Sequence, residues 1–238
     1  MSDKTFPTIE FADVECRRGS QTLLRGVDIS LTGGTVTGLI GPNGAGKSTF
    51  IATMVGDITP GAGTVKFEGT HVHKLQQRSD VFGVVTDAHG LPGRMTVGEV
   101  IQYWTAVHDV PRLRVNHLAR SMGVEHFLRK QVKKLSTGMR RRLEIVLALL
   151  PDPDVLVLDE PFNGLDVDGV EAVRNLVRQQ RDEGKIILLT THTLTEIDQL
   201  ADVLYAVHDR KLVQLDFNQG VTGSSEAAYN RLRSEVRV

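Results

Sequence analysis

Nine consecutive residues, GPNGAGKST at positions 41–49, have the types and spacing of a phosphate-binding loop. They match the pattern G-x-x-x-x-G-K-[ST] and lie between a strand-like and a helix-like segment, which is the context that this motif requires. The glycines let several backbone N–H groups point at phosphate oxygens, while the lysine reaches the outer phosphates and the serine hydroxyl ligates magnesium. The candidate ligands are Asn43, Gly44, Ala45, Gly46, Lys47, Ser48 and Thr49.

Two acidic residues end a later apolar stretch, VLVLDE at 155–160. At the carboxyl edge of a parallel sheet, side chains in this position point toward a bound ligand. We expect Asp159 to hold magnesium through water and Glu160 to orient and polarise an attacking water. Alone, this pattern is more often a solvated strand end, but a phosphate-binding loop in the same chain favours the functional interpretation.

His192 ends another apolar stretch, IILLTTH, which would place it on the same sheet edge. There it could hydrogen-bond a terminal phosphate and the attacking water, although a lone histidine at such a place is more often structural. The turn FNGLD at 162–166 follows Glu160 and could carry Asp166 toward a neighbouring subunit.

A second stretch, KKLSTGMRRR at 133–142, has the features of an anion-binding helix start. Ser136 would cap the helix, and the unpaired N–H groups after it, including that of Gly138, would present the positive end of the helix dipole. Taken alone, an ordinary N-cap is the simpler explanation. The arginines at 140–142 would add positive potential, or equally form a solvated helix face.

These residues need a mainly parallel sheet to bring them together. Continuous apolar runs at 35–40, 154–161, 185–192 and 202–208 are typical of parallel strands covered on both faces, and residues 170–184 would form a crossover helix.

Two other parts surround this predicted core. Short runs at 9–11, 27–31 and 64–67, bounded by turn residues, predict a small antiparallel sheet. From Thr96 to Leu150 the pattern is helical and starts with a capping box of Thr96 and Glu99, which predicts an inserted helical subdomain.

Composition excludes several classes of protein. The 238 residues include 28 Lys and Arg against 29 Asp and Glu, so no overall charge favours nucleic acid as a partner. Cys16 is the single cysteine, which excludes an intramolecular disulfide and fits a reducing cytosol. The apolar runs are far below the roughly 18 residues of a spanning helix, so we expect any membrane role to come through a partner.

Taken in order, GPNGAGKST, LSTGM, VLVLDEP, NGLD and TTH resemble the motifs of the nucleotide-binding subunits of ATP-binding cassette (ABC) transporters. The resemblance covers roughly residues 8–210. It implies an α/β fold with a P-loop NTPase (RecA-like) core, an ATPase domain at 1–215 with the helical subdomain at about 88–150, and a C-terminal tail at 216–238. It also implies ATP and Mg²⁺ as cofactors and hydrolysis that depends on Glu160 and His192.

The same resemblance assigns a role to the second anion-binding stretch. In the family, the signature helix of one subunit contacts ATP held by the loop of the other, so Ser136 and Gly138 would bind the partner's nucleotide. The implied partners are a second copy or a related ATPase subunit and a separate transmembrane permease. The implied location is the cytoplasmic face of the membrane.

Three parts of the sequence depart from the family pattern: the signature, the position of the glutamine and the position of the adenine-stacking aromatic residue. Thr137 and Met139 stand where the family more often has Gly and Gln, and Asp87 stands at the usual position of a glutamine. An aromatic residue commonly stacks on adenine upstream of the loop, but here Arg17 or Arg18 takes that place, and an arginine plane could stack on the base instead.

Three functions fit these observations. The stretch DAHGLPGRMTV resembles that of exporters of drugs, sodium, polysaccharides or lipids, which predicts the ATPase subunit of an ABC-2 type exporter. A second hypothesis is a soluble member of the family with a non-membrane partner, as in iron–sulfur assembly. A third is a weakly hydrolysing regulatory module, which Asp87 and Thr137 favour and which Lys47, Glu160 and His192 disfavour.

Overall fold

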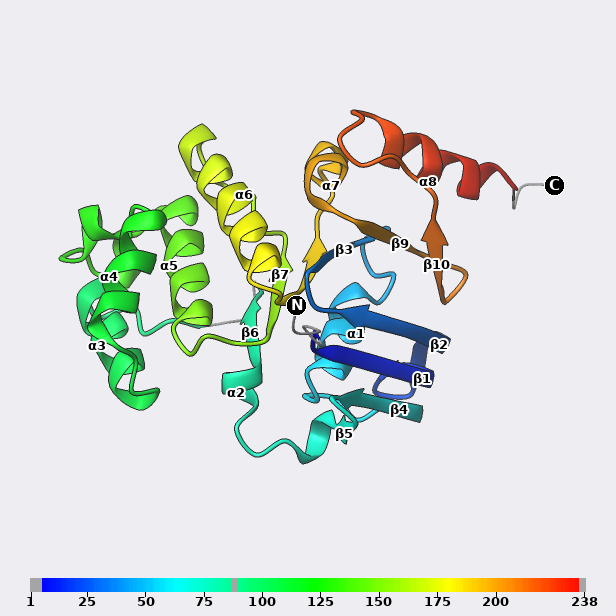
Figure 1. Ribbon diagram of the computed structural model, residues 1–238, viewed down its shortest axis with the longest axis horizontal. Coiled ribbons are helices and arrows are strands. Elements are labelled where there is room, and N and C mark those ends of the chain that lie inside the picture. Colours follow the sequence, from blue (N-terminus) through cyan, green and yellow to red (C-terminus); the bar gives the residue numbers. More distant parts are fainter. Residues whose placement is uncertain (1–5, 87–89, 236–238) are drawn as a thin grey trace, which may run out of the picture.

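The computed structural model describes residues 6–86 and 90–235, which form two sheets and a group of helices set to one side of them (Figure 1). Asp87 lies outside the described residues. Among the described residues, no helix combines the length and the apolar character needed to cross a membrane.

The smaller sheet is antiparallel, as predicted, with its strands in the order β2-β1-β4-β5. The strands are β1 (Thr8–Arg18), β2 (Gln21–Thr32), β4 (Ala62–Phe67) and β5 (Thr70–His71). Strand β1 is longer than predicted because a bulge interrupts its alternation: the buried side chains are Ile9 and Phe11 before it and Val14 and Cys16 after it. The extra length carries Arg18 to the start of the hairpin with β2.

The larger sheet has the strand order β10-β9-β3-β8-β7-β6. Its strands are β3 (Thr35–Ile40), β6 (Phe82–Val85), β7 (Val155–Asp159), β8 (Ile186–Thr190), β9 (Val203–His208) and β10 (Lys211–Leu215). All neighbouring pairs are parallel except β9 and β10, so the fold class is the predicted α/β fold with a mainly parallel sheet. Because β3, β7 and β8 end at the same edge, the residues that follow them lie together.

This larger sheet is covered on both faces, which explains why its strands are continuously apolar. Val157 and Leu188 pack in the cluster that includes the antiparallel sheet and α1, whereas Leu158 and Leu189 pack in the cluster that includes α5, α6 and α7. Successive side chains of a strand point to opposite faces, so the side chains on both faces of these strands are mostly apolar. The helices named here are α1 (Lys47–Met54), α5 (Thr137–Leu149), α6 (Val167–Asp182) and α7 (Leu194–Leu200).

The helical part comprises α3 (Val97–Val107), α4 (Arg112–Ser121) and α5 (Figure 1). The predicted capping box at the start of α3 is confirmed, because the Thr96 N–H donates to Glu99 Oε2 at 2.7 Å and the Glu99 N–H donates to Thr96 Oγ1 at 3.3 Å. The remaining helices are the short α2 (Arg78–Val81) and the C-terminal α8 (Ser224–Glu235), with single 3₁₀ turns at Val72–Lys74, Val124–Phe127 and Val132–Lys134.

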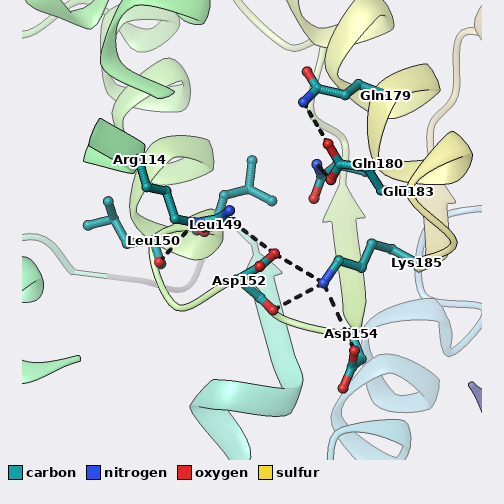
Figure 2. A network of polar contacts seen from close by, with 9 residues as sticks. All are labelled: Arg114, Leu149, Leu150, Asp152, Asp154, Gln179, Gln180, Glu183 and Lys185. Carbon is teal, nitrogen blue, oxygen red and sulfur yellow. Dashed lines mark hydrogen bonds and ion pairs between the residues drawn. The ribbon is translucent and has the colours of Figure 1, made fainter. Parts of the chain in front are cut away.

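A polar network ties the end of α5 to the larger sheet (Figure 2). Arg114 of α4 donates to the Leu149 carbonyl at 2.7 Å and to the Leu150 carbonyl at 3.2 Å, and it pairs with Asp152 at 3.0 Å. Lys185, which precedes β8, also pairs with Asp152, at 3.0 Å. The carbonyls at a helix end lack intrahelical partners, so Arg114 satisfies the end of α5 while joining it to the segment that enters β7.

Candidate functional site

The phosphate-binding loop joins β3 directly to α1. Gly46 has a positive φ of 108°, and a Cβ added there would lie 3.0 Å from the Leu23 Cβ, so both backbone conformation and space require glycine. Helix α1 begins at the next residue, Lys47, whose Nζ donates to the Gly41 carbonyl at 2.7 Å and to the Pro42 carbonyl at 3.3 Å. The loop therefore offers unpaired N–H groups beside a cation that its own carbonyls hold in place.

A cavity of about 270 Å³ lies over this loop and brings most of the predicted residues together. It is lined by Arg18, Leu23, Asn43, Gly44, Gly46, Lys47, Ser48, Thr49, Asp159 and Glu160. Ala45 does not line it and faces a neighbouring cavity instead. The loop side of the cavity offers the Lys47 cation and backbone N–H groups, which suit the phosphates of a nucleotide. The strand side offers the carboxylates of Asp159 and Glu160, which suit a divalent cation.

Asp159 and Glu160 hold different hydrogen bonds at the end of β7. The hydroxyl of Thr190 donates to Asp159 Oδ1. Glu160 Oε2 lies 2.8 Å from His192 Nδ1 and accepts from the His192 N–H at 3.3 Å. The predicted pair of Glu160 and His192 thus meets in one chain, with the Glu160 side chain 21% exposed and the His192 side chain 70% exposed.

The backbone at Glu160 is unusual for a residue with a side chain. Its φ is +52°, in the left-handed region. The Glu160 N–H donates to the Thr190 carbonyl at 3.0 Å, which holds this conformation against the end of β8. The turn sends the chain away from the sheet while the carboxylate remains at the cavity.

Ser136 and Gly138 lie at the start of α5 and do not line the phosphate cavity of their own chain. Ser136 is the N-cap, and its hydroxyl accepts from the Met139 N–H at 3.2 Å, so the N-cap prediction is confirmed. Ser136 is exposed, whereas Gly138 is buried against the turn after Glu160: a Cβ added to it would lie 2.4 Å from the Gly164 carbonyl oxygen.

Comparison with known proteins identifies the family. The model of the ABC transporter family matches residues 24–163, which includes the phosphate-binding loop, the start of α5 and the end of β7. The chain belongs to the ABC transporter family. Its members hydrolyse ATP to power transport, and this chain is an ATP-binding subunit of that family.

Curated relatives are ATP-binding proteins of transport systems. The chain is 30% identical to the lantibiotic transport ATP-binding protein SrtF of Streptococcus pyogenes, over 92% of this chain and 95% of that protein. It is 36% identical to the Nod factor export ATP-binding protein I of Ralstonia nicotianae, over 87% of this chain and 67% of that protein. These relatives favour the exporter hypothesis over a soluble member with a non-membrane partner.

Solved structures confirm the fold. The structure of an ATP binding subunit of an ABC transporter superposes with a TM-score of 0.84 at 25% identity, over 94% of this chain and 99% of that chain. A bacterial Atm1-family ABC exporter with ATP bound gives a TM-score of 0.82 at 19% identity, over 98% of this chain and 42% of that chain, which supports the fold alone.

Two of the three arginines after the ABC signature form ion pairs within the chain, which corrects both expectations for Arg141 and Arg142. Arg140 is half-exposed, and its role remains a prediction. Arg141 is 5% exposed and pairs with Glu144 at 3.1 Å. Arg142 lies on α5, the helix that starts within the ABC signature, and pairs with Asp166, the N-cap of α6. This ion pair connects α5 to the turn that follows Glu160. The Gly169 N–H and the Arg142 guanidinium hold the pKa of the Asp166 carboxyl below its usual range.

Of the two arginines at the position of the ABC family's adenine-stacking residue, Arg18 lines the phosphate cavity. Arg17 pairs with Glu15 at 2.7 Å instead. The sequence interpretation missed Thr190, which bonds Asp159 through its hydroxyl and Glu160 through its carbonyl. Thr190 lies opposite Asp159 because of the register of β7 and β8, which no motif in the sequence indicates.

Proposed function

We propose that this chain is the ATP-hydrolysing subunit of an ABC exporter that works through a separate transmembrane partner and closes head to tail with a second ATPase subunit. The observation that carries the proposal is the single cavity in which Lys47, Ser48, Asp159 and Glu160 meet. His192 completes it through its contact with Glu160.

Each residue of this cavity has a role in the proposed reaction. The N–H groups of Gly44 and of Gly46 to Thr49 cradle the phosphates, and Lys47 exchanges its carbonyl partners for phosphate oxygens. Glu160 orients a water for attack on the terminal phosphate, and His192 holds the Glu160 carboxylate and donates toward the same phosphate. Asn43 also lines the cavity, and we propose that it contacts the terminal phosphate.

Ser48 and Asp159 fit a magnesium ion. Both line the cavity, and a hydroxyl with a carboxylate is the kind of hard oxygen donor set that Mg²⁺ prefers. The hydroxyl of Thr190 fixes one oxygen of Asp159, which orients the carboxylate toward the cavity. When bound, the ion would neutralise charge on the phosphates.

The start of α5 supports the head-to-tail arrangement. Ser136 is exposed and outside its own phosphate cavity, so its hydroxyl and the neighbouring N–H groups are available to a second chain. Gly138 holds the helix start close to the turn after Glu160, so a contact made by the partner's ATP would bear on this chain's own hydrolytic turn.

A groove of about 540 Å³ between β6 and the helical part supports docking of a transmembrane partner. Phe82, Leu91, Trp104 and Leu147 give it apolar walls, and His108 adds a polar group. Thr86, which borders Asp87 in sequence, also lines the groove. We infer that an apolar segment of the permease on the cytoplasmic side of the membrane fills it, with Asp87 coupling that contact to the nucleotide.

The direct test compares Lys47→Ala with the wild-type chain in calorimetry with ATP and Mg²⁺ and in a phosphate-release assay. We expect Lys47→Ala to lose nucleotide binding almost entirely. Equal affinities would refute the phosphate-loop assignment, and binding without phosphate release by the wild-type chain would favour the regulatory module.

A further inference from the structure

A second cavity, of about 610 Å³, adjoins the phosphate cavity. Leu23 and Gly44 line both, so the two cavities meet at these residues. The larger cavity lies outside the carboxyl ends of β3 and β9, where nucleotides bind in open parallel sheets, and its far wall is α8.

The two cavities differ in what they offer a nucleotide. The side chains that line the phosphate cavity include no aromatic ring among the described residues, and the long side chain there, Arg18, is a cation. The larger cavity has Tyr229 and Arg233 on α8, Leu23 on β2 and the amide of Gln21 at the hairpin. A purine needs a flat apolar surface and a few hydrogen-bonding groups at its edge, and only the second set provides both.

Helix α8 is held firmly enough to present these side chains. Asp198 of α7 is 1% exposed and accepts from the Gly223 N–H at 2.7 Å and from the Ser225 N–H at 2.8 Å. Ser225 in turn donates from its hydroxyl to the Leu194 carbonyl at 3.2 Å. The start of α8 is therefore fixed to the helix that follows His192, and Tyr229 lies about one turn further on.

Tyr229 and Arg233 act as one surface. The Arg233 guanidinium carbon lies 5.9 Å from the centre of the Tyr229 ring, which is a cation–π contact between residues one turn apart. Tyr229 is partly buried against the core, so its ring is anchored while it lines the cavity. A ring and a guanidinium plane together form a stacking platform for a base.

We propose that the base and ribose of ATP enter this larger cavity, that Tyr229 and Arg233 supply the stacking surface, and that Arg18 contacts the phosphates. The inference rests on the proposed function, in which the loop at 41–49 binds the phosphates. In this arrangement the base stacks on Tyr229 and Arg233 of the C-terminal helix α8, and not on Arg18 as the family pattern implies.

The test compares two ligands, ATP and inorganic tripolyphosphate, each titrated with Mg²⁺ into the full-length chain. Tripolyphosphate fills the loop but has no base. Tyr229→Ala should weaken ATP binding roughly 5- to 100-fold, the range for one stacked base, and leave tripolyphosphate binding within about twofold. Tyr229→Phe should keep the affinity for ATP, and Asn230→Ala, an exposed neighbour on the same helix, should change neither ligand.

Two further variants show which part of the proposal has failed if the results differ from these. Arg18→Ala should weaken both ligands by similar factors, and Lys47→Ala should abolish both. Unchanged binding by Lys47→Ala would overturn the loop assignment and this proposal with it. If Lys47→Ala behaves as expected, the base pocket alone is overturned by equal losses of both ligands in Tyr229→Ala, by no loss of ATP affinity, or by a loss specific to ATP in Arg18→Ala.

Discussion

We expect hydrolysis to depend most sharply on the Glu160 side chain. Glu160→Gln keeps the shape of the residue and removes the charge that contacts His192 Nδ1 and that we propose orients the attacking water. We expect phosphate release to fall by roughly 100- to 10,000-fold, the usual contribution of a general base, while ATP affinity persists. Glu171→Gln, an exposed residue on α6, is the control. A Glu160→Gln chain that hydrolyses at the control rate would show that the attacking water is oriented elsewhere.

Charge at Asp166 gives a pH-dependent prediction. Its folded pKa is lowered, so the carboxylate stabilises the fold above its ordinary value of 3.8, and this contribution is lost as pH falls through the lower folded value. Asp166→Asn retains an N-cap but loses the contact with the Arg142 charge. Urea unfolding should show a stability deficit near neutral pH that shrinks on acidification. A deficit independent of pH would point to lost packing. Asp168→Asn is the control, because it removes a negative charge from the same turn of α6 without removing the contact with Arg142.

For single residues, the sequence predicts which side chains belong to the site better than it predicts which residues they contact. The motif at 41–49 and the pair at 159–160 were predictable because their spacing is dictated by a strand, a loop and a helix. Thr190 and the link from Arg142 to Asp166 were not predictable, because they join segments far apart in sequence and depend on sheet register and helix phase. The roles given to the site residues remain predictions.

Helix α5 is held at both ends, and its end near Arg114 offers a stability test. Arg114→Met keeps the aliphatic stem but removes the guanidinium from the carbonyls of Leu149 and Leu150 and from the carboxylate of Asp152, which keeps its pair with Lys185 (Figure 2). Charged hydrogen bonds of this kind contribute roughly 1–3 kcal/mol, so the free energy of unfolding should fall by about that much. Arg112→Met, exposed on the same helix, should change it little. Equal stability of the two variants would show that water replaces the network.

Element prediction succeeded where the pattern was continuous. The parallel strands and the helices at 97–149 were predicted because both sheet faces are covered and the caps are explicit. Strand β10 was missed because KLVQL is an edge strand with one polar side, and β1 was truncated because its bulge breaks the period of two. The division of the chain after residue 215 remains a prediction, and α8 beyond that point packs on α7.

The whole molecule should associate only while ATP is bound and intact. Each chain would present Ser136 to the other's nucleotide, so Glu160→Gln should accumulate a dimer in sedimentation with ATP and Mg²⁺. Adding Ser136→Arg places bulk and charge at the contact and should return the chain to monomers. Ser121→Arg, at the exposed end of α4, is the matched control. Equal dimerisation of Glu160→Gln with and without Ser136→Arg would leave Ser136 as an N-cap and nothing more.

The left-handed backbone at Glu160 lowers the stability of the fold, while the side chain at the same position is the proposed general base. Glycine takes a positive φ freely, whereas a residue with a side chain gives up of order 1 kcal/mol there, so the most stable chain would have no carboxylate at position 160. If the carboxylate is the general base that we propose, selection for hydrolysis would retain it despite this cost. A descendant freed from transport would therefore be expected to drift toward glycine or asparagine at this position, gaining thermal tolerance as it lost turnover.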